Sequence, residues 1–262
     1  MDKLNHFSLM IDELMDLAEK EQAHQTPPVP GLPTLRSAIA DSSPLPREAA
    51  FLGLAEDGLP VLLNLYDPIS GSILISGDQA SGKTRLLQTI ARAVELTHSA
   101  SDVQYCVITQ RPNEWAKFHG NPNNAGIYET QSPATQDLIH SLVEWARNNN
   151  SEEQSVILLL DDLEALTQLN QQTEQNLRWL FLRGPRFRTW PIATINASRA
   201  HNVEPWLNFF RTRLFGFTKD STDASFLTSD PNKALNTLVA GSEFTLREGD
   251  NWINFWAPSI DE

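Results

Sequence analysis

The residues best suited to do chemistry form one octapeptide, Gly77-Asp78-Gln79-Ala80-Ser81-Gly82-Lys83-Thr84. It follows the apolar run 73–75 and leads into residues 85–94, where apolar side chains recur at helical spacing. This is the strand–GxxxxGK[ST]–helix order of a phosphate-binding P-loop. The glycines let the backbone curl so that N–H groups and the positive end of the helix point at a phosphate. The alternative is a Gly-rich turn that binds nothing.

The P-loop predicts a site for a nucleoside triphosphate. We expect Lys83 to reach the β- and γ-phosphates and Thr84 to hold Mg²⁺. The expected nucleotide-binding residues are Gly77, Asp78, Gln79, Ala80, Ser81, Gly82, Lys83, Thr84 and Arg85.

Two carboxylates, Asp161 and Asp162, end the apolar run 156–160. Downstream of a P-loop, the first acid after a buried strand is placed to hold Mg²⁺, and the next to orient or deprotonate the attacking water. We therefore assign Asp161 to the metal and Asp162 to catalysis. The alternative for Asp162 is an N-cap of the following helix. Hydrolytic P-loop proteins usually carry Glu at this point, and the shorter Asp predicts slow or absent hydrolysis.

Further polar candidates follow along the chain. Asn196 ends the predicted strand 189–196, where its amide can bond to the γ-phosphate or the attacking water, or simply satisfy a turn. Between residues 178 and 213 there are seven arginines and one acid, Glu204. A guanidinium supplied in trans strongly promotes phosphoryl transfer. The candidate donors are Arg186, Arg188, Arg211 and Arg213, and the alternative is a solvated or ion-paired face.

The composition limits the classes of protein to consider. The 262 residues carry a formal net charge of −13, which argues against general affinity for nucleic acid and leaves the arginine-rich stretch as a local feature. The single cysteine, Cys106, excludes a disulfide framework. We find neither an apolar stretch of membrane-spanning length nor a signal-peptide pattern, so we expect a cytoplasmic protein.

Strand and helix patterns alternate along most of the chain, which predicts an α/β fold with a mostly parallel sheet covered by helices on both faces. Antiparallel strand pairs are expected before the P-loop (51–54 with 61–65) and at the C-terminus (242–246 with 252–256). Other expected strands are 103–109, 127–128, 156–162, 189–196 and 209–218; expected helices are 132–147, 176–182, 221–227 and 233–239.

The N-terminal region differs in character. Residues 1–22 place apolar side chains on one helical stripe and acids on the other face, which favours docking on the same domain or on a partner protein over binding to an anionic membrane. Residues 23–49 are rich in proline and predict an extended linker, with a helical turn at 35–40. The catalytic domain is therefore expected over residues 50–262.

These features together resemble the FtsK/HerA superfamily of P-loop motor ATPases, closest to its FtsK/SpoIIIE branch. The likeness runs from about residue 50 to 257: the strand pair before the P-loop, residues 103–114, Pro191–Asn196, the arginine strand at 211–217 with the following Asp220 and Ser221, and the Gly249–Asp250 turn. It implies a RecA-like core with ATP and Mg²⁺, a homo-oligomeric (hexameric) ring, and double-stranded DNA moved by ATP hydrolysis.

The chain departs from the family pattern at three positions. Asp162 replaces the usual Glu, Asn196 the usual Gln, and Thr109 an Asp. Two alternatives to a DNA translocase therefore stay open. One is a nucleotide-gated assembly protein with little turnover, and the other is a secretion-type motor that acts on protein.

Overall fold

The computed structural model describes residues 33–149, 154–167, 169–248 and 251–260, which belong to one compact unit that begins at Pro33. The amphipathic helix expected over residues 1–22 lies outside the described residues, as does the Gly249–Asp250 turn. None of the described helices is both long and apolar enough to cross a bilayer.

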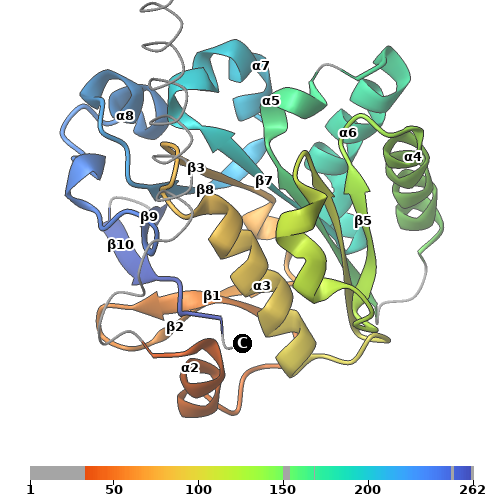
Figure 1. Cartoon of the computed structure of the whole chain (residues 1–262), viewed down its shortest axis with the longest axis horizontal. Helices are drawn as coiled ribbons and strands as arrows, with labels where there is room; N and C mark the ends of the chain where they lie inside the picture. Colours follow the sequence, from red (N-terminus) through yellow and green to blue (C-terminus); the bar gives the residue numbers. More distant parts are fainter. Residues whose placement is uncertain (1–32, 150–153, 168, 249–250, 261–262) are drawn as a thin grey trace, which may run out of the picture. The chain divides into compact units, whose positions relative to one another are not determined.

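A ten-stranded sheet forms the centre of the unit, in the order β2-β1-β10-β9-β8-β3-β7-β6-β4-β5 (Figure 1). The six strands from β8 to β5 run parallel, and the other four pair antiparallel, so the mostly parallel sheet is confirmed. The strands are β1 (Ala49–Ala55), β2 (Pro60–Asn64), β3 (Ser72–Gly77), β4 (Val103–Thr109), β5 (Asn124–Glu129), β6 (Ser155–Asp161), β7 (Thr189–Asn196), β8 (Phe210–Gly216), β9 (Glu243–Glu248) and β10 (Asn251–Trp256).

Helices cover both faces of the sheet, as predicted. The α-helices are α2 (Leu35–Asp41), α3 (Lys83–Thr97), α4 (Pro133–Asn148), α5 (Leu163–Leu166), α6 (Gln171–Arg183), α7 (Glu204–Leu207) and α8 (Ser221–Thr228). Short 3-10 helices are η1 (Pro68–Ser70), η2 (Pro112–Phe118), η3 (Gly184–Phe187), η4 (Ala197–Val203) and η5 (Leu235–Thr237).

The two larger hydrophobic cores lie on opposite faces of the sheet because side chains alternate along the buried strands. In β6, Leu158 and Leu160 join the core beneath α4 and α6, whereas Ile157 and Leu159 join the core beneath α3 and η2. Every residue of β6 is buried, which accounts for its continuous apolar sequence. This double burial fixes the end of β6, and therefore the position of Asp161, relative to the P-loop helix.

The two expected antiparallel pairs are also present, and both extend the same sheet. β1 pairs with β2 before the P-loop, β9 pairs with β10 near the C-terminus, and β10 joins the two pairs through β1. β9 also pairs antiparallel with β8, which connects this extension to the parallel part.

Two expectations for the elements need correction. The segment 233–239 forms no α-helix, because only the single turn η5 is helical there. The linker expected over 23–49 ends earlier, since α2 packs Leu35 and Ala38 against Phe51 and Ala93. The Thr34 side chain caps α2, and Leu35 N donates to Ser259 O at 2.8 Å. Residues 33–49 therefore belong to the domain.

Candidate nucleotide site

The carboxyl ends of four parallel strands bring the predicted site residues to one edge of the sheet. In the register of the sheet, Gly77 at the end of β3 pairs with Asn196 at the end of β7. Likewise, Thr109 at the end of β4 pairs with Asp161 at the end of β6. Clefts at this edge are the usual ligand sites of open α/β sheets. The predicted P-loop, carboxylate and amide positions therefore meet in space.

The loop between β3 and α3 is too closely packed for side chains at its glycines. A Cβ on Gly77 would lie 2.5 Å from Ser81 Oγ, and a Cβ on Gly82 would lie 2.6 Å from Gly241 O. Gly82 also has φ +95°, which a residue with a side chain rarely adopts. These contacts explain the glycines as requirements of a curled, phosphate-sized turn that opens helix α3.

The segment after β8 supports the same loop. Asp78 N donates to Phe217 O at 2.8 Å, and Lys219 N donates to Asp78 Oδ2 at 2.7 Å. The segment after β8 therefore holds the P-loop in addition to β3.

Lys83 begins α3 and folds back over the loop. Its Nζ donates to Gly77 O at 2.9 Å, to Asp78 O and to Ser81 Oγ at 3.3 Å. Burial lowers the pKa of Lys83 to about 8, although the carboxylates of Asp161, Asp78 and Asp162 act in the opposite direction. A partly desolvated ammonium that bonds only to neutral acceptors in its own loop is suited to bind an anion.

Asp161 is buried among hydroxyl groups from three elements. It accepts from Thr84 Oγ1 at 3.0 Å, from Thr109 Oγ1 at 3.3 Å and from Thr194 Oγ1 at 3.2 Å. These oxygens are hard ligands of the kind Mg²⁺ prefers, and Mg²⁺ in such sites is completed by phosphate and water. Thr84 and Asp161 therefore fit a Mg²⁺–triphosphate group. No set of three or more His, Cys, Asp or Glu side chains in the described ranges is grouped to hold a metal ion.

Asp162 lies in a strained backbone conformation directly after the buried strand. Its φ and ψ are 92° and 92°, and its Oδ1 accepts from Glu164 N at 3.1 Å, so it is the N-cap of α5. Its own N–H donates to Thr194 Oγ1 at 2.9 Å. Burial raises the pKa of its carboxyl group. The capping alternative is therefore present in this structure, and the backbone of Asp162 is tied to Thr194, which also bonds to Asp161.

Asn196 sits between β7 and η4, next to Gly77 in the sheet. Its Oδ1 accepts from Ser198 N at 3.3 Å and from Ser198 Oγ at 3.2 Å, so it caps η4. From η4, Arg199 and Asn202 contact the two carboxylate oxygens of Glu164 at 3.1 and 2.8 Å. Side-chain contacts therefore join η4, which Asn196 caps, to α5, which Asp162 caps.

The four arginines predicted to act in trans lie away from their own P-loop. Arg186 and Arg188 precede β7, and Arg211 is near the start of β8, so these three are at the sheet edge opposite Gly77. Arg213 lies within β8, and it donates to Leu207 O at 2.8 Å and Leu227 O at 3.4 Å. Arg188 stacks on the Tyr66 ring at 3.7 Å, whereas Arg186 and Arg211 are exposed.

Two residues at the site were not assigned a role from the sequence. Thr194 is an ordinary strand residue in the pattern, and only the fold shows that its hydroxyl bonds to both Asp161 and Asp162. Arg111, two residues after β4, has a guanidinium nitrogen 4.0 Å from Asp161 Oδ2. Its sequence signal was its position in a polar tail at the end of a buried strand.

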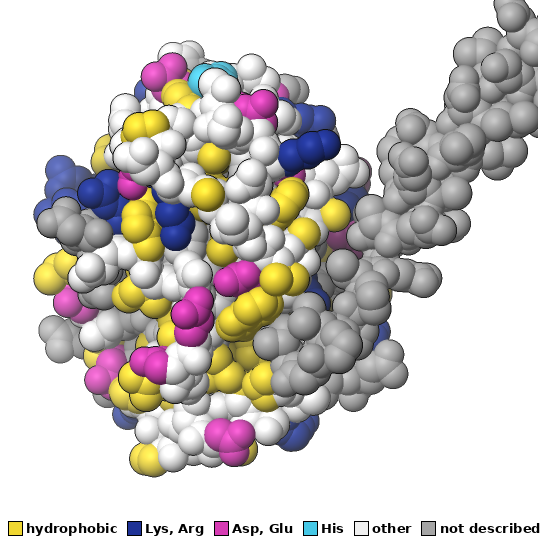
Figure 2. Space-filling model, turned by 90° about the vertical axis from the view of Figure 1, so that its left-hand side faces the viewer, with side chains coloured by type: hydrophobic (Ala, Val, Ile, Leu, Met, Phe, Trp, Pro, Cys, Tyr) yellow, Lys and Arg dark blue, Asp and Glu magenta, His cyan; other side chains and the backbone are white. Residues whose placement is uncertain are grey.

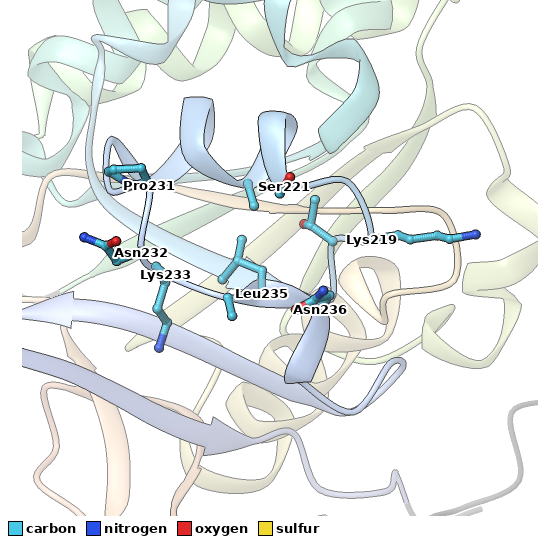
Figure 3. Close-up of a pocket in the computed structure, with 10 residues that line it drawn as sticks. Lys219, Ser221, Pro231, Asn232, Lys233, Leu235 and Asn236 are labelled. Atoms are coloured by element: carbon cyan, nitrogen blue, oxygen red, sulfur yellow. The ribbon is translucent and has the colours of Figure 1, made fainter.

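A pocket of about 140 Å³ lies beyond the P-loop, between the end of β8, the start of α8 and the segment before β9 (Figure 3). Lys219 borders it, but its side chain points away from the other lining residues. The pocket touches the P-loop only indirectly, through the bond from Lys219 N to Asp78. It is therefore separate from the phosphate-binding turn.

The surface charge is uneven on one face of the protein. On the face shown in Figure 2, Lys and Arg side chains gather near one side, whereas Asp and Glu side chains are scattered among hydrophobic ones. The arginine-rich stretch of the sequence is similarly local within an acidic chain.

Solved structures with the same fold share little sequence with this chain. ATPases 2 and 3 of EssC from Geobacillus thermodenitrificans match with a TM-score of 0.71 and 15% identity, over 90% of this chain and 48% of that chain. ATPases 2 and 3 of EccC from Thermomonospora curvata, in complex with a signal sequence peptide, match with a TM-score of 0.66 and 15% identity, over 88% and 43%. The pCW3 conjugation coupling protein TcpA, in monomer form with ATPγS, matches with a TM-score of 0.65 and 16% identity, over 88% and 70%.

The chain has the fold of a RecA-like P-loop ATPase domain. It spans less than half of the EssC and EccC chains that it matches. No family model and no curated protein sequence matches it. The likeness to these solved structures confirms the RecA-like fold predicted from the sequence.

Proposed function

We propose that this chain binds Mg²⁺–ATP at the P-loop and hydrolyses it as the motor domain of an FtsK/HerA-type ring. The observation that carries the proposal is the arrangement of Lys83, Thr84 and Asp161. The lysine rests on the carbonyls of the curled loop, and the threonine hydroxyl lies 3.0 Å from the carboxylate. In P-loop ATPases these groups bind the β- and γ-phosphates and Mg²⁺.

Residues of this chain supply the remaining steps of the proposed reaction. Bound Mg²⁺ would neutralise charge on the phosphates while Asp161 holds it, usually through water. Asp162 would orient or deprotonate the attacking water, and the side-chain amide of Asn196 would hydrogen-bond to the γ-phosphate or to that water. One of Arg186, Arg188, Arg211 or Arg213 would act on the site of a neighbouring copy. Arg186 and Arg211 fit best, because both are exposed and Arg213 bonds within its own chain.

We propose double-stranded DNA as the polymer that the ring moves, in the cytoplasm, following the FtsK/SpoIIIE-like pattern of residues 50–257. A protein substrate is the second candidate, because the similar structures include the EccC type VII secretion ATPase. A nucleotide-gated assembly protein is the third, because Asp162 is both short and engaged in capping α5. The segment 1–22 is a candidate contact for a partner protein.

The test is ATP turnover with and without duplex DNA, together with the native mass of the protein. The proposal predicts turnover in an oligomer that is several times faster with duplex DNA and absent in Lys83→Ala. Turnover that DNA leaves unchanged would favour a protein substrate. ATP binding without measurable turnover under either condition would replace the motor with a nucleotide-gated assembly.

A further inference from the structure

We propose that Arg111 binds the γ-phosphate of ATP within its own subunit, so that it distinguishes ATP from ADP. This inference rests on the proposed ATP site and adds a residue to it. The position of Arg111 follows from the strand order, in which β4 lies beyond β6 when counted from the P-loop strand β3. A group at the end of β4 therefore lies past the carboxylate proposed to hold the metal, when counted from the P-loop strand.

The Arg111 guanidinium faces the site from that side. One terminal nitrogen lies 4.0 Å from Asp161 Oδ2, and the other lies 2.8 Å from Glu114 Oε1. A guanidinium and the carboxylate proposed to hold the metal therefore lie together where a terminal phosphate would add negative charge.

The turn that carries Arg111 is fixed to the P-loop helix. Arg111 N donates to Thr109 Oγ1 at 3.1 Å, and Gln88 of α3 donates from Nε2 to Glu114 O at 2.9 Å. Trp115 and Phe118 of η2 are buried in the core beneath α3. The side chain itself is half exposed, at 51%. A rigid base with an accessible guanidinium allows Arg111 to exchange Asp161 for a phosphate without rearrangement of the fold.

The other described arginines do not offer the same contact from their own chain. Arg186, Arg188 and Arg211 lie at the opposite edge of the sheet, and Arg213 bonds to backbone carbonyls. Arg199 lies at the same edge as Arg111, but its guanidinium pairs with Glu164 Oε2 at 3.1 Å. Arg85 is on α3, directly after the P-loop threonine. Arg111 is thus the guanidinium in the described ranges that lies beside the metal-binding carboxylate.

Calorimetry with Mg²⁺–ATPγS and Mg²⁺–ADP tests this role in the full chain. Loss of one charge-assisted bond predicts that Arg111→Ala weakens ATPγS binding about 10- to 100-fold and leaves ADP binding within about twofold. Arg111→Lys should recover part of the loss because it keeps the charge. Arg178→Ala is a matched control, since Arg178 also pairs with an acid on its own helix (Glu174, 2.6 Å) and is 46% exposed.

The outcomes separate this inference from the proposed function. If the parent binds both nucleotides and Arg111→Ala binds both as the parent does, or loses both equally, the γ-phosphate role of Arg111 is wrong and the ATP site stands. If the parent binds neither nucleotide, the proposed function itself is wrong.

Discussion

The backbone conformation of Asp162 predicts that the carboxylate proposed for catalysis is held at a cost in stability. A side-chain-bearing residue at φ 92°, ψ 92° is strained by about 1–3 kcal/mol. Asp162→Gly and Asp162→Ala both remove the carboxylate and its bond to Glu164 N, but only glycine removes the Cβ. With about 2 kcal/mol taken for the strain, the roughly 0.5–1 kcal/mol of extra backbone entropy that glycine loses on folding leaves the glycine variant about 1 kcal/mol more stable than the alanine variant.

Thermal unfolding of the two variants measures this difference. For a domain of this size, about 1 kcal/mol corresponds to ~2–4 °C in Tm, so Asp162→Gly should melt at least ~2 °C above Asp162→Ala. Both variants should keep ATP binding and lose hydrolysis. If the alanine variant is as stable as the glycine variant, the backbone at residue 162 is not strained and this reasoning fails.

Three further predictions follow from individual contacts. Arg213→Ala should lower the free energy of unfolding by about 2 kcal/mol, because it removes charge-assisted bonds to Leu207 O and Leu227 O. Arg186 is exposed, so Arg186→Ala should change the free energy of unfolding by less than about 0.5 kcal/mol. Denaturant titration compares the two variants, and equal losses would contradict this prediction. Thr194→Val should weaken Mg²⁺–ATP binding and lower stability, because it removes the hydroxyl that bonds to Asp161 and to Asp162 N. Thr194→Ser retains that hydroxyl and should retain both the affinity and the stability. Identical behaviour of the two variants in calorimetry would refute this prediction. Burial raises the pKa of Cys106 to about 12, so at pH 8 only about 10⁻⁴ of the thiol is ionised and a thiol reagent should react only on unfolding; rapid labelling of the native protein would show that Cys106 is accessible.

The sequence predicted those parts of the site that depend on local order along the chain. The P-loop is contiguous and lies between one strand and one helix, and the run before Asp161 is apolar because both faces of β6 are buried. Both patterns include the neighbouring strand or helix, so the sequence alone indicates where the functional residues lie in the fold. The predicted convergence of Gly77, Asp161 and Asn196 needed only the rule that parallel strands end at one edge of a sheet.

The sequence could not predict contacts that depend on strand order. Thr109, Thr194 and Arg111 face Asp161 because β4 and β7 both flank β6. The positions of Thr109 and Arg111 at the end of a buried strand were visible in the sequence, but their contact with Asp161 was not. The composition of segment 233–239 is compatible with a helix, but only Leu235–Thr237 (η5) is helical in the structure. Leu235 is the buried residue of η5, and the sequence pattern alone did not show that the helical turn is limited to these residues. The strained φ at Asp162 likewise arises from the junction of β6 with α5.

The central claim is that Lys83 and its loop bind Mg²⁺–ATP. The most direct measurement is calorimetric titration of the full-length parent and of Lys83→Ala with Mg²⁺–ATPγS, with thermal unfolding to confirm that both are folded. The proposed site predicts saturable binding by the parent and a loss of about 100-fold or more in the variant, since the ammonium faces both terminal phosphates. Equal affinity in the two folded proteins, or no binding by either, would contradict it.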